Sequence, residues 1–139
     1  MIVLDTSVAY AILDGADRRH RQAARWYERV DDDLITTPLV LAELDHLAVS
    51  RAGAAAAGAL RRDVIAGAYV FEWWDGAAAA AAEIAEAHAD LGLSLTDASL
   101  VALADRLRTT DVATFDERHF RVVRPVSGAG AFRLLPIDV

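Results

Sequence analysis

Short apolar runs alternate along the chain with longer segments in which apolar residues recur at helical spacing. Short runs of this kind are typical of strands that are buried on both faces of a sheet. They lie at residues 2–4, 34–36, 69–73, 111–114 and 132–135. The helical segments lie at residues 7–13, 18–30, 38–50, 54–66, 76–91, 96–107 and 117–120. Because strands and helices alternate, the pattern predicts right-handed crossovers and a mostly parallel five-stranded sheet.

Length and composition indicate one compact unit. The chain has 139 residues, enough to bury a core, and 55% of them are hydrophobic, which excludes a disordered chain. No internal repeat or linker interrupts the pattern. We therefore expect residues 1–139 to form a single α/β domain with three layers, α/β/α.

The composition also excludes several kinds of site and function. There is no cysteine, so disulfides and thiolate metal sites are impossible. All 14 basic residues are arginines, and without lysine a P-loop is excluded. The net charge of -7 argues against a protein that coats nucleic acid, but not against an enzyme that acts on it. No segment has the pattern of a membrane span or a signal peptide, so we expect a cytoplasmic protein without a membrane partner.

Four acidic residues are expected at the carboxyl edge of the sheet, where proteins of this class bind ligands. Asp5 ends the first strand, Glu43 lies in the helix after the second, Asp97 begins the helix at 96–107, and Asp116 follows the fourth strand. Each also has a purely structural interpretation, as a helix cap, a solvated side chain, a charge favoured by the helix dipole or a turn residue. Their common position favours a shared role.

Carboxylates that lie close together raise one another's pKa, and a divalent cation removes this conflict. Oxygen ligands favour a hard ion, Mg²⁺ or Mn²⁺, which can activate water and stabilise a transferring phosphoryl group. We expect the hydroxyls of Thr6, Ser7 and Thr114 near the same edge, where they would orient water or a phosphate oxygen. Helix capping is the alternative for each of them, and for Ser7 it is the favoured interpretation.

The segments that contain these acids resemble the motifs of PIN-domain proteins, and most of all those of the bacterial VapC toxins. They are residues 4–7, 37–44, 95–104 and 114–120. No single motif is specific, but all four occur in order and span the chain. The resemblance implies a PIN-like fold with sheet order 3-2-1-4-5. It also implies a type II toxin: a homodimeric endoribonuclease whose catalytic acids and Mg²⁺ or Mn²⁺ ligands are Asp5, Glu43, Asp97 and Asp116, paired with a VapB-type antitoxin.

The substrate implied by the resemblance is RNA. An acid-rich surface must rely on few contacts, which favours a structured RNA with an exposed loop. Residues 42–47 look like those of toxins that cut the sarcin–ricin loop of ribosomal RNA, with transfer RNA as the alternative. Arg18, Arg19 and Arg25 are candidates for phosphate contacts, although solvation of a helix is the favoured interpretation for most of the arginines in this segment. A basic residue of the antitoxin, preferably arginine, is expected to enter the acidic pocket in place of the cation.

Other functions fit parts of the sequence. A metal-dependent phosphatase of the haloacid-dehalogenase type also begins with an apolar strand and an aspartate, but it needs a second aspartate two residues later and a lysine. A metal site built on His46, three residues after Glu43, is a further possibility. His20, His88 and His119 show no pairing that would indicate zinc. An RNA-binding PIN-like module without activity would be expected to have lost at least one of the four acids, and none is lost.

Overall fold

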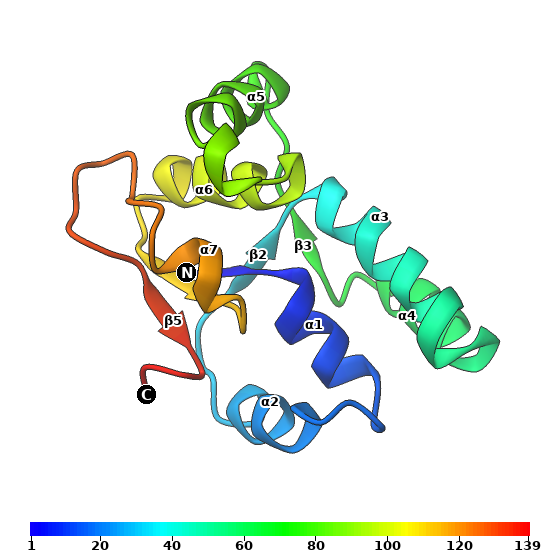
Figure 1. Cartoon of the computed structure of the whole chain (residues 1–139). Coiled ribbons are helices and arrows are strands. Elements are labelled where there is room, and N and C mark those ends of the chain that lie inside the picture. The colour runs from blue at the N-terminus through cyan, green and yellow to red at the C-terminus, as the bar shows by residue number, and fades with distance from the viewer.

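The computed structural model describes residues 1–139 and contains one five-stranded sheet between layers of helices (Figure 1). The strands are β1 (Ile2–Leu4), β2 (Leu34–Thr36), β3 (Val70–Phe71), β4 (Asp111–Ala113) and β5 (Arg133–Leu135). Their order is β3-β2-β1-β4-β5, and every neighbouring pair is parallel. The expected sheet and its strand order are confirmed.

The helices cover both faces of the sheet. They are α1 (Thr6–Leu13), α2 (His20–Tyr27), α3 (Pro38–Leu47), α4 (Ala54–Ile65), α5 (Ala77–Ala87), α6 (Leu95–Leu107) and α7 (Glu117–Phe120). Figure 1 shows α5 and α6 on one side of the sheet and α1 and α2 on the other. Helix α3 contributes buried residues to the cores on both sides. No helix is both long enough and apolar enough to cross a membrane.

Strands β1, β4 and β5 are covered on both faces because consecutive residues pack against opposite helical layers. Val3, Ile35, Val112 and Leu134 belong to the core that contains α6. Their neighbours on β1, β4 and β5 belong to the core that contains α1 and α4. The strand register places those four side chains in one row across the sheet. This double burial explains why the strand segments lack alternating polar residues.

The strand order brings polar residues to one edge of the sheet. Asp5 and Thr114 directly follow β1 and β4, which are paired neighbours. Helix α6 begins at the same edge, where the Ser94 hydroxyl accepts a hydrogen bond from the Asp97 N–H at 3.1 Å. This cap fixes Asp97 in the first turn of the helix.

Some elements are shorter than the sequence predicts. The helix expected at residues 18–30 is the shorter α2, which spans His20–Tyr27. Its start is delayed because Asp17 Oδ1 accepts the Arg19 N–H at 2.8 Å and holds the residues before His20 in a turn. Helix α3 passes into a π-helical turn, Ala48–Ala52, which closes at Gly53 with φ 96°. Strand β3 has two residues, and α5 is followed by a separate 3-10 turn, Ala89–Leu91.

We expect Leu103→Ala to lower the free energy of unfolding by about 2–5 kcal/mol, because it removes a fully buried side chain and leaves a cavity. Leu103 is 0% exposed, within α6. Ile65→Ala is the matched control, since Ile65 is 86% exposed and its loss should change stability by less than about 0.5 kcal/mol. Urea denaturation of both variants tests this, and equal effects would contradict the assignment of the core.

Candidate active site

A polar pocket of about 530 Å³ lies at the carboxyl edge of the sheet. The four acids expected there, Asp5, Glu43, Asp97 and Asp116, all line it. They come from the end of β1, from α3, from α6 and from the residue before α7. The fold therefore brings together the acids that the sequence predicted to share one site.

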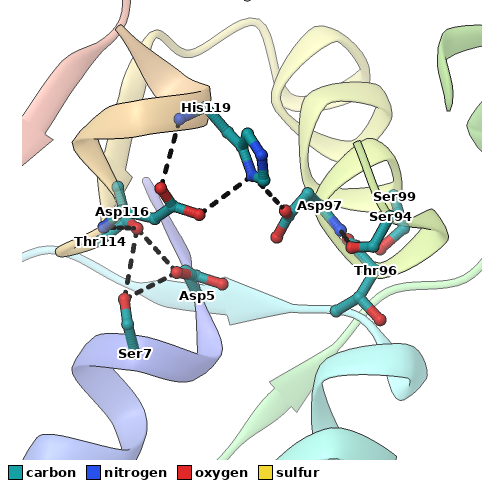
Figure 2. A network of polar contacts seen from close by, with 9 residues as sticks. All are labelled: Asp5, Ser7, Ser94, Thr96, Asp97, Ser99, Thr114, Asp116 and His119. Carbon is teal, nitrogen blue, oxygen red and sulfur yellow. Dashed lines mark hydrogen bonds and ion pairs between the residues drawn. The ribbon is translucent and has the colours of Figure 1, made fainter. Parts of the chain in front are cut away.

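Asp5 lies deepest and is held by hydroxyl groups. It is 4% exposed, and its Oδ2 accepts hydrogen bonds from Ser7 Oγ and Thr114 Oγ1, each at 2.7 Å (Figure 2). Burial raises the pKa of Asp5, and the hydrogen bonds from Thr114 and Ser7 oppose this effect. Asp5 occupies the N-cap position of α1, but its side chain makes no capping hydrogen bond. The helix-cap interpretation therefore does not explain this carboxylate.

The helix-capping interpretation favoured for Ser7 is wrong, because Ser7 is the second residue of α1 and Asp5 occupies the N-cap position. The Ser7 hydroxyl oxygen accepts the Phe115 N–H at 2.9 Å while the hydroxyl donates to Asp5. Thr114 Oγ1 similarly accepts the Asp116 N–H at 2.9 Å. These two hydroxyls connect the start of α1 to the segment after β4, which fixes the relative position of Asp5 and Asp116.

The Thr6 hydroxyl lines the same pocket without a partner. The residue is 2% exposed, and Thr6 Oγ1 is the buried side-chain polar atom that has no hydrogen bond. A buried hydroxyl in this state costs on the order of 1–3 kcal/mol. The supporting role expected for Thr6 stays a prediction.

His119 links two of the other three carboxylates of the site, those of Asp97 and Asp116. Its Nδ1 lies 3.0 Å from Asp97 Oδ2 and 3.1 Å from Asp116 Oδ2 (Figure 2). Ionised carboxylates only accept hydrogen bonds, so Nδ1 carries the proton when both acids are charged. Burial raises the pKa of Asp97 to about 6, the charges of Asp5 and Asp116 add to the increase, and the His119 hydrogen bond opposes it.

His119 had no predicted role, because no second histidine is suitably spaced in the sequence. The informative spacing was instead that between Asp116 and His119, three residues apart. Asp116 Oδ1 accepts the His119 N–H at 3.2 Å and so caps α7, and this turn directs the imidazole back to the Asp116 carboxylate. Asp116 is therefore both a turn residue and a member of the acidic site.

Glu43 differs from the other acids because it is exposed and accepts no hydrogen bond from the protein. Its charge nevertheless contributes to the raised pKa of Asp5. His46, the possible ligand next to Glu43 on α3, is exposed and does not line the pocket. The structure therefore does not support a metal site built on His46.

Arginines surround the mouth of the acidic pocket. They are Arg18, Arg19, Arg51 and Arg118, and none of them forms an ion pair. The Arg19 guanidinium lies 4.5 Å from the centre of the Phe115 ring, a cation–π contact that holds it at the site. Of the three arginines considered for RNA binding, two are at this pocket, whereas Arg25 is not.

The donor atoms fit a divalent cation. Asp97, Asp116 and His119 each offer a ligand atom, and these atoms lie within 4.8 Å of one another. Asp5 is close enough for its charge to raise the pKa of Asp97. A cation would relieve this repulsion. Carboxylate oxygens suit both Mg²⁺ and Mn²⁺, and an imidazole nitrogen in the set is more compatible with a transition metal.

Comparison with known proteins gives consistent results. The model of the PIN domain family matches residues 2–125. Ribonuclease VapC26 of Mycobacterium tuberculosis is 36% identical over 141 aligned residues, which cover 97% of this chain and all of the relative. The crystal structure of M. tuberculosis VapC20, described as a sarcin–ricin loop cleaving toxin, superposes with a TM-score of 0.77 at 26% identity and covers 84% of this chain and 90% of its own. FitAcB from Neisseria gonorrhoeae matches with a TM-score of 0.62 at 21% identity, over 84% and 88% of the two chains, which shows similarity of fold.

The raised pKa of Asp97 predicts how stability depends on pH in the metal-free protein. Between its ordinary value of 3.8 and about 6, the folded state binds more protons than the unfolded state. The free energy of unfolding should therefore fall as the pH rises through this window. Asp97→Asn should make the dependence shallower, whereas Asp90→Asn, at an exposed position outside the pocket, should follow the wild type. Urea titrations across this pH range measure the slopes, and a wild-type slope equal to that of Asp97→Asn would contradict the prediction.

Proposed function

Because the chain belongs to the PIN-domain family, and within it to the VapC-type ribonucleases, we propose that its acidic pocket is the active site of a Mg²⁺- or Mn²⁺-dependent endoribonuclease toxin. The observation that carries this proposal is the convergence of four acids from distant elements on one pocket. Residues 1–139 then constitute one PIN domain. Cleavage of RNA, rather than binding alone, is favoured because all four acids are present.

Each residue has a defined part in this proposal. Asp5 and Asp97 would hold the metal directly, and Glu43 and Asp116 would complete its shell, partly through water. When bound, the ion supplies stabilisation of charge on the scissile phosphate and a water that is nucleophilic at neutral pH. The protein groups fix the geometry: Ser7 and Thr114 orient Asp5, and Thr6 offers its unpaired hydroxyl to water or phosphate.

The arginines at the mouth of the pocket supply contacts to the substrate. Arg18 and Arg19 bind phosphates next to the cut site, because a guanidinium matches the geometry of a phosphate and these two have no acidic partner. The substrate is the sarcin–ricin loop of 23S ribosomal RNA, and transfer RNA is the second candidate. The description of VapC20, at 26% identity over most of both chains, supports the first.

A VapB-type antitoxin restrains the enzyme in this proposal. Relationship to VapC26 and VapC20 supports such a partner, since the second of these is described as a toxin. The acidic pocket can accept an antitoxin arginine, which would pair with the carboxylates in place of the cation. The active form is a homodimer, as the VapC resemblance implies.

A metal-dependent phosphatase is the alternative enzyme. The haloacid-dehalogenase type is not supported, because the residue two positions after Asp5 is a serine whose hydroxyl donates to Asp5. Release of nitrophenol from nitrophenyl phosphate, without cleavage of RNA, would favour a phosphatase. Binding of RNA without cleavage, in the presence of each divalent metal tested, would favour an RNA-binding module without activity.

We expect Asp5→Asn to lower the rate of RNA cleavage roughly 100-fold or more, since it removes the charge of a metal ligand while preserving its shape. Asp90→Asn is the control for loss of one acidic charge outside the pocket. Removal of divalent ions with EDTA should abolish cleavage, and addition of Mg²⁺ or Mn²⁺ should restore it. If the EDTA-treated protein cleaves as well as the metal-loaded one, the metal-dependent mechanism is wrong.

The target is tested by mapping RNA 5′ ends in cells after induction of the protein. We expect one new 5′ end within the sarcin–ricin loop of 23S RNA, and intact transfer RNAs, because the acidic surface requires a specific structured loop. The Asp5→Asn variant, induced equally, should give no new end. Cuts in transfer RNA with intact 23S RNA would reject the first substrate in favour of the second.

A further inference from the structure

Helix α2 and its flanking turns carry a row of arginines, of which only Arg18 lines the acidic pocket. Arg18, Arg21, Arg25 and Arg29 follow one another at intervals of three or four residues, and Arg21 and Arg25 lie on one side of the helix itself. All four line a groove of about 700 Å³ between α2 and the end of β5. We call these residues the α2 arginine row.

The α2 arginine row is not neutralised by the protein. None of its members forms an ion pair, whereas four other arginines of the chain do. Arg133, which also lines the groove, is held by Asp111 through two hydrogen bonds of 2.9 and 2.6 Å. Asp32 is the acid in the lining, and it binds the Met1 amino group at 3.0 Å. The groove therefore has an excess of positive charge.

This excess has no structural benefit. Like charges at these spacings destabilise a helix, and the whole chain has a net charge of -7. A groove that collects unpaired guanidinium groups attracts a polyanion, and guanidinium binds phosphate through two parallel hydrogen bonds. Trp26 and Pro136 add apolar surface to the lining, which suits the sugars and bases of a nucleotide chain.

The groove and the acidic pocket share the side chain of Arg18, which lines both. A strand that leaves the pocket past Arg18 would reach the groove beside Arg21 and Arg25. We infer that this groove binds the phosphodiester backbone of the RNA that flanks the cut site. The inference rests on the proposed ribonuclease function and adds the path of the substrate. An acidic protein segment would meet the same charges, but the connection with the pocket favours RNA.

The test compares two double variants that each remove two positive charges. Arg21→Gln with Arg25→Gln changes the groove, and Arg62→Gln with Arg124→Gln is the control, at exposed positions outside it that form no ion pair. The probe is a fluorescent oligouridylate of about ten nucleotides, a length within the usual range of single-strand sites. Its binding is measured in EDTA at several salt concentrations, so that cleavage does not contribute.

We expect the groove variant to bind roughly ten-fold more weakly at low salt, because two phosphate contacts are lost. The slope of log affinity against log salt concentration is negative, and its magnitude should decrease by about 1.4. Each phosphate contact to a single strand contributes about 0.7, and two contacts are lost. The control should match the wild type in both quantities. Arg21→Lys with Arg25→Lys should retain the slope, because the charges remain, while losing part of the affinity. Circular dichroism should be unchanged for all variants, as these side chains are exposed.

Equal slopes for the groove variant and the control would overturn the inference. So would a groove variant that loses binding to polyglutamate but keeps binding to oligouridylate, since that result assigns the groove to an acidic protein segment. The proposed function fails separately: a wild-type protein that neither binds nor cleaves RNA refutes it. If the wild-type protein cleaves RNA but the salt slope of binding is unchanged in the Arg21→Gln, Arg25→Gln variant, only the inference about the groove is refuted.

Discussion

Repulsion between carboxylates at the carboxyl edge of the sheet is the constraint on which the rest of the structure depends. Asp5 is 4% exposed, and its charge adds to the effect of burial that raises the pKa of Asp97 to about 6. Such groups stay close only if other interactions fix the backbone that carries them. The apolar row through Val3 and Val112 does this, because it locks β1 against β4 from within the core. Hydrophobic burial therefore supports an electrostatic arrangement that is unfavourable by itself.

Two sets of donors limit the repulsion within the chain, and they leave ligand atoms available. Ser7 and Thr114 donate to one oxygen of Asp5, and His119 Nδ1 approaches one oxygen of Asp97. Figure 2 shows the second oxygen of each of these carboxylates facing the space between them. Each acid is thus oriented through one oxygen while the other remains free for a ligand. Protein donors that orient ligand groups in this way are characteristic of metal sites.

The sequence predicted the features that depend on periodicity and order along the chain. Buried strands are recognisable in the sequence as apolar runs, so the sheet and the four acids at its carboxyl edge were predicted. The strand order followed from the family resemblance. His119 was missed because its role depends on a cap at Asp116 that turns the imidazole toward α6, an arrangement visible only in three dimensions. The start of α2 was misplaced because Asp17 accepts the Arg19 N–H, and this local bond competes with the helix. The groove lined by the arginines of α2 was not predicted, because the sequence does not specify which surface each side chain lines.

The distribution of charge explains how a protein with a net charge of -7 can act on RNA. Two of the acids that would repel the substrate, Asp5 and Asp97, lie on the floor of the pocket, where burial raises their pKa and so disfavours their ionised forms. Unpaired arginines lie at the mouth of this pocket and along the adjoining groove. A cation bound to the acids would reverse the local charge of the pocket floor. The floor and the surrounding arginines would then both attract the phosphates of the RNA. Binding of metal and binding of RNA would then be thermodynamically linked, because the cation that relieves the repulsion between the carboxylates would also strengthen the attraction for phosphate.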